Sequence, residues 1–415
     1  MSELEKLIKE LCPDGVEYKA FFDICDYIRG ITYNKNDEIN DGSSGIKILR
    51  ANNITLETNT LNFDDIKTVS NDVKIKEIQR LKKNDILICA GSGSKEHIGK
   101  VAYIFENIDY TFGGFMGVVR PKTEDLKSRY LFHILTSDIF KKHLAKMSSA
   151  ASSTINNINN DTWKDFKIPL PPLPVQQEIV RILDNFTKLT KELTKELTAR
   201  KKQYEHYRDA LLSFDDIRSA NQMDNGGRYN NNVIYRKLGE ICEIGKGIQF
   251  NKENMQDKGS YPVINGGINP SGYIEQFNND ENTITISQGG ASAGYVNWIK
   301  TKFWAGAHCY IVKPLECILN RYIFHFIKSQ EHRLQECQYG AGIPALSKST
   351  ISELSIPVPP LETQRRIVSI LDKFEMLANS LSDGLPAEIE ARKKQYEYYR
   401  DKLLDFKDVG GGIAC

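Results

Sequence analysis

An internal repeat constrains this chain of 415 residues more than any other feature of its sequence. The segment IPLPPLPVQQEIVRILDNF at 168–186 returns as IPVPPLETQRRIVSILDKF at 356–374, an offset of 188 residues. The segment ARKKQYEHYRDALLSF at 199–214 returns as ARKKQYEYYRDKLLDF at 391–406, with 13 of 16 positions identical. Self-similarity at a fixed long period indicates duplicated structural units. The chain is therefore predicted to contain two copies of one unit.

A fainter repeat extends into the segments that precede these tails. Residues 18–37 align with residues 235–254, and RYLFHILTS from Arg129 aligns with RYIFHFIKS from Arg321. Between these anchors the two copies differ strongly, and the second is 25 residues shorter. Each copy is thus predicted to be a variable head followed by a nearly invariant tail.

The tails have the apolar spacing of long helices. Apolar side chains recur in steps of three and four residues through 179–211 and again through 367–403, which marks one helix face. A helix over 175–212 would be ~57 Å long at 1.5 Å per residue. In the second tail, Gly384 and Pro386 predict a kink or a break.

Two arrangements of the tails are compatible with this pattern. Each tail could be an ordinary core helix that packs only on its own head. Alternatively, the two helices pair with each other and set the distance between the heads. Near identity of the tails beside divergent heads favours pairing, because a spacer or a shared partner must meet the same surface twice.

The heads have the signals of mixed α/β domains. Short β-rich runs such as NDILICAG and NTITISQG are bounded by turn residues, and helical patterns follow at 129–147 and 321–337. Gly- and Ser-rich loops occupy matching places from Ala90 and Ser287, and again from Ser148 and Tyr339. The predicted fold class is α+β, with two mixed α/β heads and two long helices in a pseudo-twofold repeat.

Catalytic and metal-binding signatures are missing from the sequence. The loop before Lys100 would need glycine at Ser94 and a hydroxyl residue at Val101 to bind phosphate as a P-loop. HExxH and GxSxG do not occur. The eight cysteines form no CxxC pair, which favours reduced thiols over a zinc site. His133 and His325 lie at equivalent positions in apolar helices and are predicted to pack there.

Composition excludes some classes and leaves others open. With 55 basic and 54 acidic residues the net charge is +1, so any nucleic-acid binding must use a local patch. No run of ~18 apolar residues predicts a membrane span, and the N-terminus lacks the pattern of a secretory signal. A cytoplasmic protein without membrane contact is expected.

Polar and basic side chains on the head loops are typical of a DNA-reading surface. Arg and Lys contact guanine edges and phosphates, whereas Asn and Gln contact adenine. For any single residue, the alternative is a solvated loop side chain. The candidate DNA-binding residues are Arg29, Lys35, Arg50, Asn52, Asn53, Lys95, His97, Lys100, Lys246, Gln249, Asn251, Lys252, Asn265, Asn269, Gln288, Ser292 and Tyr295.

The doubled tail makes this chain resemble the specificity (S) subunit of type I restriction-modification systems. The resemblance rests on the two tail motifs and on the GKGIQFNK, GGINPSGYIE and GIPALS stretches of the second head. It implies an antiparallel coiled coil of the tails and two target recognition domains, each reading half of a split, asymmetric DNA target. The predicted segments are 1–17 (N-terminal helical segment), 18–167 (target recognition domain 1), 168–214 (helical spacer 1), 215–234 (linker), 235–355 (target recognition domain 2), 356–406 (helical spacer 2) and 407–415 (C-terminal tail).

The resemblance also implies partners for a subunit with no catalytic site of its own. Two modification subunits would carry S-adenosylmethionine and methylate adenine, and restriction subunits would use ATP and Mg²⁺ in host defence; a phage inhibitor is a further possible partner. No cofactor is expected on this chain. The N-terminal segment 4–12 is expected to sit beside the first head as 211–217 sits beside the second. Two alternatives stay open: a self-sufficient methyltransferase or nuclease fusion, and a tandem protein-binding scaffold.

Overall fold

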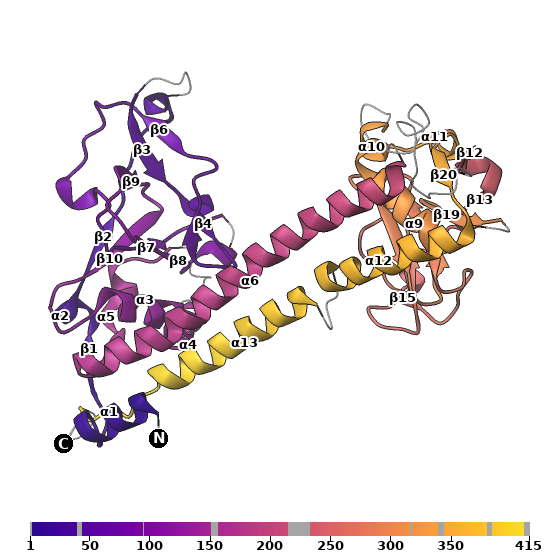
Figure 1. The fold of residues 1–415 in the computed structure, drawn as a ribbon. Helices are drawn as coiled ribbons and strands as arrows, with labels where there is room; N and C mark the ends of the chain where they lie inside the picture. The colour runs from indigo at the N-terminus through magenta and orange to yellow at the C-terminus, as the bar shows by residue number, and fades with distance from the viewer. Residues whose placement is uncertain are drawn as a thin grey trace, which may run out of the picture. The chain divides into compact units, whose positions relative to one another are not determined.

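The chain divides into two compact units, which are described separately (Figure 1). The computed structural model describes residues 2–39, 44–93, 95–150, 157–214, 233–315, 318–338, 344–379 and 384–410. Unit 1 comprises residues 1–192 and 389–415, and unit 2 comprises residues 193–388. Residues 215–232 of the predicted linker 215–234 and the loops at 151–156 and 339–343 lie outside the described residues.

A four-stranded antiparallel sheet is the centre of the head in unit 1. Its strand order is β2 (Cys25–Arg29), β10 (Met116–Pro121), β7 (Ile86–Cys89) and β8 (Val101–Tyr103). Smaller sheets accompany it: β6 (Lys67–Val69), β3 (Ile46–Leu49) and β9 (Tyr110–Phe112); β4 (Ile54–Thr55) and β5 (Thr60–Leu61); and β1 (Glu17–Ala20) with β11 (Lys167–Leu170). Strand β3 pairs with β6 in the antiparallel direction and with β9 in the parallel direction.

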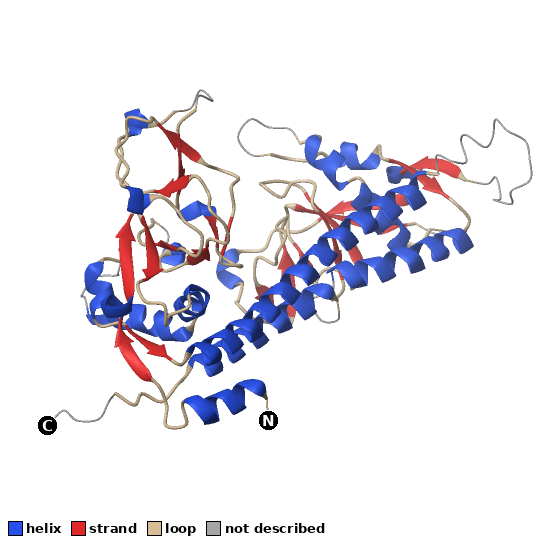
Figure 2. Cartoon of the chain, turned by 60° about the vertical axis from the view of Figure 1, so that its left-hand side comes forward, coloured by secondary structure: helices blue, strands red, loops and turns tan. Residues whose placement is uncertain are grey.

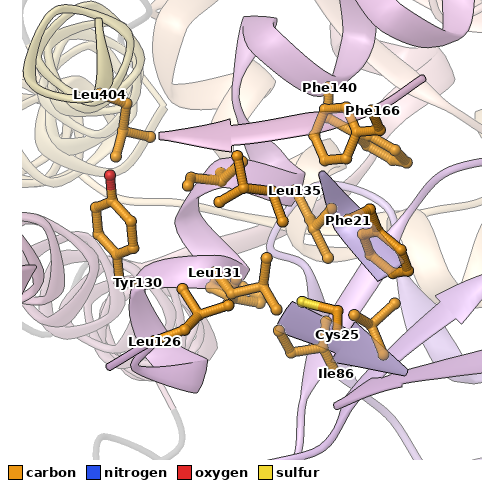
Figure 3. Close-up of a cluster of buried hydrophobic side chains, with 14 of the residues drawn as sticks. Phe21, Cys25, Ile86, Leu126, Tyr130, Leu131, Leu135, Phe140, Phe166 and Leu404 are labelled. Atoms are coloured by element: carbon orange, nitrogen blue, oxygen red, sulfur yellow. The ribbon is translucent and has the colours of Figure 1, made fainter. Parts of the chain in front are cut away.

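The helices of this unit bury an aromatic core, and α1 (Glu3–Leu11) lies beside the tail helices (Figure 1). The other head helices are α2 (Phe21–Ile24), α3 (Ser128–Thr136), α4 (Asp138–Ala150) and α5 (Asn160–Lys164), with short 3₁₀ turns η1 (Lys35–Asp37), η2 (Ala51–Asn53), η3 (Glu77–Gln79) and η4 (Lys95–His97). Figure 3 shows Phe21, Phe140 and Phe166 gathered in this core, and the ring of Phe21 stacks on Trp163 at 4.2 Å. Each such ring contributes roughly 2–3 kcal/mol by burial, which anchors the helices on the sheet.

Unit 2 repeats the same strand order. Its main sheet is β13 (Cys242–Lys246), β19 (Cys309–Pro314), β16 (Thr283–Ser287) and β17 (Val296–Ile299). The smaller sheets are β15 (Tyr273–Ile274), β14 (Tyr261–Ile264) and β18 (Trp304–Ala305), and β12 (Ile234–Lys237) with β20 (Ser355–Val358). The helices are α8 (Leu238–Ile241), α9 (Asn320–Ser329), α10 (Glu331–Glu336) and α11 (Lys348–Ser352), with η5 (Lys252–Asn254). The α+β class with two sheet-rich heads is confirmed.

The tails are long helices that pack on each other, as predicted. The first is the 41-residue helix α6 (Leu173–Ser213), and the second consists of α12 (Leu361–Asn379) and α13 (Leu385–Leu404). In unit 1 the ring of Phe186 in α6 stacks on Tyr399 of α13 at 5.6 Å. In unit 2 the ring of Tyr207 in α6 stacks on Phe374 of α12 at 5.3 Å. The N-terminal half of α6 therefore contacts α13, and its C-terminal half contacts α12. Helices that contact each other in this order run antiparallel (Figure 2).

The end of the second tail closes against the start of the chain in unit 1. The Val16 amide donates to the carbonyl of Lys407 at 2.9 Å, and the Val409 amide donates to the carbonyl of Val16 at 3.1 Å. The Tyr18 hydroxyl donates to the carbonyl of Phe406 at 2.8 Å. The equivalent Tyr235 hydroxyl donates to the carbonyl of Ser213 at the end of α6, at 3.0 Å. Each head therefore receives the end of one tail on its first strand.

The described cysteines are all free. Cys12, Cys25, Cys89, Cys242 and Cys309 are buried, and Cys337 is exposed. Burial raises the pKa of the Cys89 thiol to about 11, so it is a protonated packing group at neutral pH. Within the described ranges, no helix has the length and apolarity that a bilayer crossing requires.

Candidate nucleic-acid interface

Several loops of the first head meet at one end of its main sheet. We call this surface tip 1; it consists of residues 29–31, 89–91, 112–116 and 157–158. The amides of Ala90 and Gly91 both donate to the carbonyl of Phe115, at 2.8 and 2.9 Å. The Gly30 amide donates to the carbonyl of Met116 at 3.0 Å. Gly91 also forms a β-bridge with Asn157, which joins two of the loops predicted to match between the copies.

The second head has the same hydrogen bonds at the equivalent place. Tip 2 consists of residues 246–248, 287–289, 305–309 and 345–346. The Gln288 amide donates to the carbonyl of His308 at 2.9 Å, and the Gly247 amide donates to the carbonyl of Cys309 at 3.0 Å. A bridge between Gly289 and Ala345 replaces that between Gly91 and Asn157. The two tips share a backbone although most of their side chains differ.

A glycine at the end of the first sheet strand permits this close approach in both heads. A Cβ atom on Gly30 would lie 2.1 Å from the carbonyl oxygen of Gly113. A Cβ atom on Gly247 would lie 2.2 Å from the carbonyl oxygen of Gly306. Both distances are far below van der Waals contact, so only glycine fits here. This explains why the two copies share glycine at this position of otherwise divergent heads.

Arg29 belongs to tip 1, but its guanidinium group is engaged with the protein. Its Nε donates to the carbonyl of Gly114 at 2.7 Å. Its terminal nitrogens donate to the carbonyl of Ile158 at 2.6 Å and to the side chain of Asn157 at 2.8 Å. Arg29 therefore holds three loops of the tip together. Its equivalent in tip 2 is Lys246, which is exposed at the end of β13.

Arg50 and its neighbours form a polar cluster beside tip 1. Arg50 pairs with the Asp65 carboxylate at 2.6 Å, and the Asn52 amide donates to the same carboxylate at 3.0 Å. Asn53 is fully buried, and its side chain accepts from the Arg50 amide at 2.8 Å. Asn53 thus shapes the turn η2, whereas Arg50 is half-buried and Asn52 is exposed.

The remaining candidates of the first head are dispersed. Lys35 is exposed at the start of η1, and His97 lies in η4; the side chain of Lys95 is outside the described part. The Lys100 ammonium group lies 3.4 Å from the carbonyl of Leu56. Burial, with Lys141 nearby, lowers the pKa of Lys100. The Lys100 ammonium group is therefore engaged with the protein backbone.

In the second head, one candidate supports the tip directly. The Asn265 side chain accepts from the His308 amide at 3.2 Å, at the position equivalent to Arg50. Gln288 contributes its backbone to tip 2 through the amide that binds the carbonyl of His308. Other candidates are exposed on the loops that flank the tip: Gln249, Asn251, Lys252 and Asn269.

The Tyr295 ring faces helix α9, and Ser292 lies in the turn that precedes it. The Lys328 ammonium group lies 4.4 Å above the Tyr295 ring. The Tyr295 amide donates to the carbonyl of Ser292 at 2.9 Å. Among the candidates, tip 2 contains Lys246 and Gln288, and Asn265 supports it from the neighbouring loop. Tyr295 contacts the tip through its backbone, because its carbonyl accepts from the Ser287 amide at 2.9 Å. Contact of any candidate with DNA stays a prediction.

A buried polar network joins each head to the tails, and the sequence did not reveal it. His133 Nε2 lies 3.0 Å from Asp184 of α6, and its Nδ1 lies 3.1 Å from the Tyr396 hydroxyl of α13. His325 Nε2 lies 2.8 Å from Asp372, and its Nδ1 lies 3.3 Å from the Tyr204 hydroxyl. Each histidine thus uses the aspartate of its own copy and the tyrosine of the other copy. The sequence did contain a signal for this network: the histidine, the aspartate and the tyrosine each occupy equivalent positions in the two copies.

Ion pairs join the charged side chains beside both histidines. Arg129 pairs with Asp184 at 2.7 Å in unit 1. In unit 2, Arg321 pairs with Asp372 at 2.7 Å and also with Glu375. His325, Asp372 and Glu375 lie close enough to bind a metal ion. The guanidinium group of Arg321 already supplies the positive charge there, so this cluster is an ion-pair network.

Comparison with known proteins gives one consistent result. The family model "Type I restriction modification DNA specificity domain" matches residues 13–200 and 230–391, well over half of the chain. A protein of Haemophilus influenzae that carries the name of a type I restriction enzyme specificity subunit is 34% identical over 308 residues, which cover 68% of this chain and 73% of the relative. The EcoR124I/EcoR124II specificity subunit of Escherichia coli is 37% identical over 276 residues, which cover 60% of this chain and 65% of the relative.

Solved structures share the fold at lower identity. The S subunit of a type I restriction-modification system from M. genitalium has a TM-score of 0.55 and 18% identity, covering 94% of this chain and 97% of its own. A chain from a study of complex assembly and conformational transition of a type I R-M system has a TM-score of 0.56 and 18% identity, covering 94% of this chain and 98% of its own.

Proposed function

We propose a mode of DNA recognition for this chain, which belongs to the type I restriction-modification DNA specificity family. It is the DNA specificity subunit of such a system, and specificity subunits are the non-catalytic members of these complexes. Membership of the family places the chain in a type I complex that acts on DNA. Within that complex, the two heads would read the target and the tails would set its spacing.

In the proposed mode, each head reads one half of a bipartite, asymmetric target. One observation carries the proposal: the same backbone frame forms tip 1 and tip 2, but it holds different side chains. Lys246 in tip 2 is equivalent to Arg29 in tip 1. Asn265 beside tip 2 is equivalent to Arg50 beside tip 1, so the two frames carry different polar groups. Two equal frames with unequal side chains are suited to reading two unequal half-sites. The proposed reading domains are 18–167 and 235–355.

The tails are proposed to set the gap between the half-sites. Half-sites one helical turn apart are ~34–36 Å distant. The helix α6, with 41 residues, is ~60 Å long at 1.5 Å per residue. Two modification subunits, which would carry S-adenosylmethionine, are proposed to dock on the matching tails, 168–214 and 356–406. Restriction subunits with ATP and Mg²⁺ would join this core, in the cytoplasm where the DNA is.

Methylation of defined duplexes by the assembled modification complex tests this mode. Methylated adenines are first located in host DNA by single-molecule sequencing, which gives the target. Duplexes are then made with the first half-site altered, with the second altered, and with the gap changed by one base pair. We expect alteration of either half-site to reduce methylation at least about fivefold, because each mismatched position costs ~1–3 kcal/mol. The changed gap should also reduce methylation, because both heads can then no longer meet their half-sites together.

The controls separate this mode from its alternatives. A base change in the centre of the gap, at constant length, should leave methylation unaltered. Methylation that is indifferent to gap length would contradict the role of the tails. Methyl transfer by this chain alone would support the enzyme fusion, and absence of DNA binding in the assembled complex would support the protein scaffold.

A further inference from the structure

We infer that Phe115 and His308 are equivalent, specificity-determining residues that contact base edges from the two tips. Neither belongs to the candidates that the sequence suggested. The inference rests on the proposed function, because it needs each head to read its own half-site. It adds to that function one named contact in each head and the chemistry of each contact.

The equivalence of the two residues follows from their hydrogen bonds. Each residue directly precedes the strand that lies second in its sheet, β10 or β19. The carbonyl of Phe115 accepts from the Ala90 amide at 2.8 Å, and that of His308 accepts from the Gln288 amide at 2.9 Å. One residue further on, Met116 and Cys309 each donate an amide to the glycine at the start of the turn, at 2.7 and 3.1 Å.

The backbone that presents these side chains is held from several directions. In tip 1, Arg29 Nε donates to the carbonyl of Gly114, the residue before Phe115, at 2.7 Å. In tip 2, the His308 amide donates to the Asn265 side chain at 3.2 Å. A side chain on such a restrained turn loses little freedom when a ligand is bound, which favours specificity.

Both side chains project out of this restrained backbone. The Phe115 side chain is 70% exposed, so its ring is accessible to a ligand. His308 is also exposed, and within the described ranges its imidazole has no hydrogen bond. The candidates Arg29 and Asn265 are used to support the turn, so the turn's own side chains are those left free to contact DNA.

The two side chains have different chemistry on the same frame. An apolar ring favours the C5 methyl group of thymine in the major groove. An imidazole N–H group donates to an acceptor such as purine N7. Phe115 is therefore assigned to a thymine in the first half-site, and His308 to a purine in the second. This is the kind of difference that an asymmetric target requires.

Base analogues test each contact in the assembled modification complex. For Phe115, each thymine of the first half-site is replaced in turn by deoxyuridine, which removes only the methyl group. We expect one replacement to weaken binding of the wild-type complex about threefold to fourfold, the value of one buried methyl group. The Phe115→Ala complex should not respond to that replacement. For His308, each purine of the second half-site is replaced in turn by its 7-deaza analogue, which removes the N7 acceptor. One replacement should weaken binding of the wild-type complex, and the His308→Ala complex should not respond to it.

Matched variants control for loss of surface side chains in general. Phe105→Ala removes another exposed ring of the first head, 64% exposed, and His332→Ala removes another exposed imidazole of unit 2, 84% exposed. Both should keep the wild-type response to the analogues. Melting temperatures establish that all four variants are folded.

The possible outcomes are distinct for the inference and for the proposed function. Loss of the analogue response in Phe115→Ala and His308→Ala, each in its own half-site only, supports the inference. The inference is overturned if the variants respond to the analogues like the wild type, or if they weaken binding equally on every sequence. Either result leaves the proposed bipartite target unaffected. A wild-type complex without any bipartite preference would instead overturn the proposed function.

Discussion

At the scale of single residues, His133 shows how burial outweighs a neighbouring charge. Its ring is fully buried between α3 and the tail helices, with Asp184 on one nitrogen and Tyr396 on the other. Burial lowers the pKa of His133 to about 4, although the hydrogen bond to Asp184 acts in the opposite direction. A neutral ring that donates from Nε2 to Asp184 and accepts at Nδ1 from the Tyr396 hydroxyl satisfies all three groups.

This pKa predicts that the stability of the chain falls in mild acid. The folded-state pKa of about 4 lies below the ordinary 6.5, so the unfolded chain binds more protons between these values. The contribution of His133 is therefore complete above pH 6.5 and is lost as the pH falls toward 4. The loss is up to about 3 kcal/mol of unfolding free energy. Denaturant melts of the full chain at intervals between pH 7.5 and 4.5 measure this.

Two histidine variants control this prediction. The His133→Gln variant should have a flatter pH dependence than wild type, because the titrating group is gone. The exposed His332→Gln variant should follow the wild-type curve. Asp184 does not confound this window: burial raises its pKa, but hydrogen bonds from His133 and Arg129 outweigh that and hold it below 3.8. Equal slopes in all three proteins would refute the assignment.

Single residues also show where prediction from the sequence ends. The apolar helices around His133 and His325 correctly predicted burial. The hydroxyl partner of His133 lies 263 positions away in the chain, so local periodicity could not identify it. For the same reason, candidates such as Arg29 and Asn53 looked like free loop side chains, whereas the structure gives them internal hydrogen bonds.

At the scale of elements, the long helices were the most predictable part. Their steps of three and four residues predicted 175–212, and α6 occupies Leu173–Ser213. The order of the strands was not predictable, since β10 pairs with β2 and β7, which are far from it in the chain. Short strands have similar β-rich sequences, so only the packed head selects their neighbours. The predicted segment limits remain predictions.

The turn at each tip predicts a sharp difference between two neighbouring glycines. A methyl group on Gly247 would meet the carbonyl oxygen of Gly306 at 2.2 Å, whereas Gly245, two residues earlier in β13, has no atom within 4 Å of such a group. We expect Gly247→Ala to lower the unfolding free energy by about 1–3 kcal/mol, because the strand end must move away. Gly245→Ala should be neutral or slightly stabilising.

Chemical denaturation of the two alanine variants measures this difference. The Gly30→Ala variant provides the same test in the first head, where the distance is 2.1 Å. If Gly247→Ala were as stable as Gly245→Ala, the rigid frame assigned to the tips would be wrong. In DNA binding, Gly247→Ala should impair recognition of the second half-site more than recognition of the first.

At the scale of the whole molecule, the two ends of the described chain are held together in unit 1. Val16 pairs with residues 407–409 through two backbone hydrogen bonds. The junction between α6 and β12 in unit 2 has the corresponding contact between Tyr235 and Ser213. One junction is bridged by the chain segment 215–232, and the other has no covalent link.

This similarity predicts that the chain tolerates circular permutation. A gene that joins residue 415 to residue 1 through a short flexible linker and opens the chain within 215–232 should give a protein with nearly the wild-type melting temperature. Its modification complex should methylate the same target. Opening the chain inside α6, between Lys195 and Glu196, is the control and should reduce stability strongly, because it interrupts a continuous helix. Equal loss in both permutants would count against the closed arrangement.

The crosswise pairing of histidines with tyrosines has a consequence for a protein made of a single copy. Such a half-length chain would keep its histidine and its aspartate but would leave the imidazole without a hydroxyl group, since Tyr396 serves His133 and Tyr204 serves His325. Two identical halves could supply that group to each other across a dyad. The resulting homodimer would carry the same reader twice, and its cognate sequence would be palindromic.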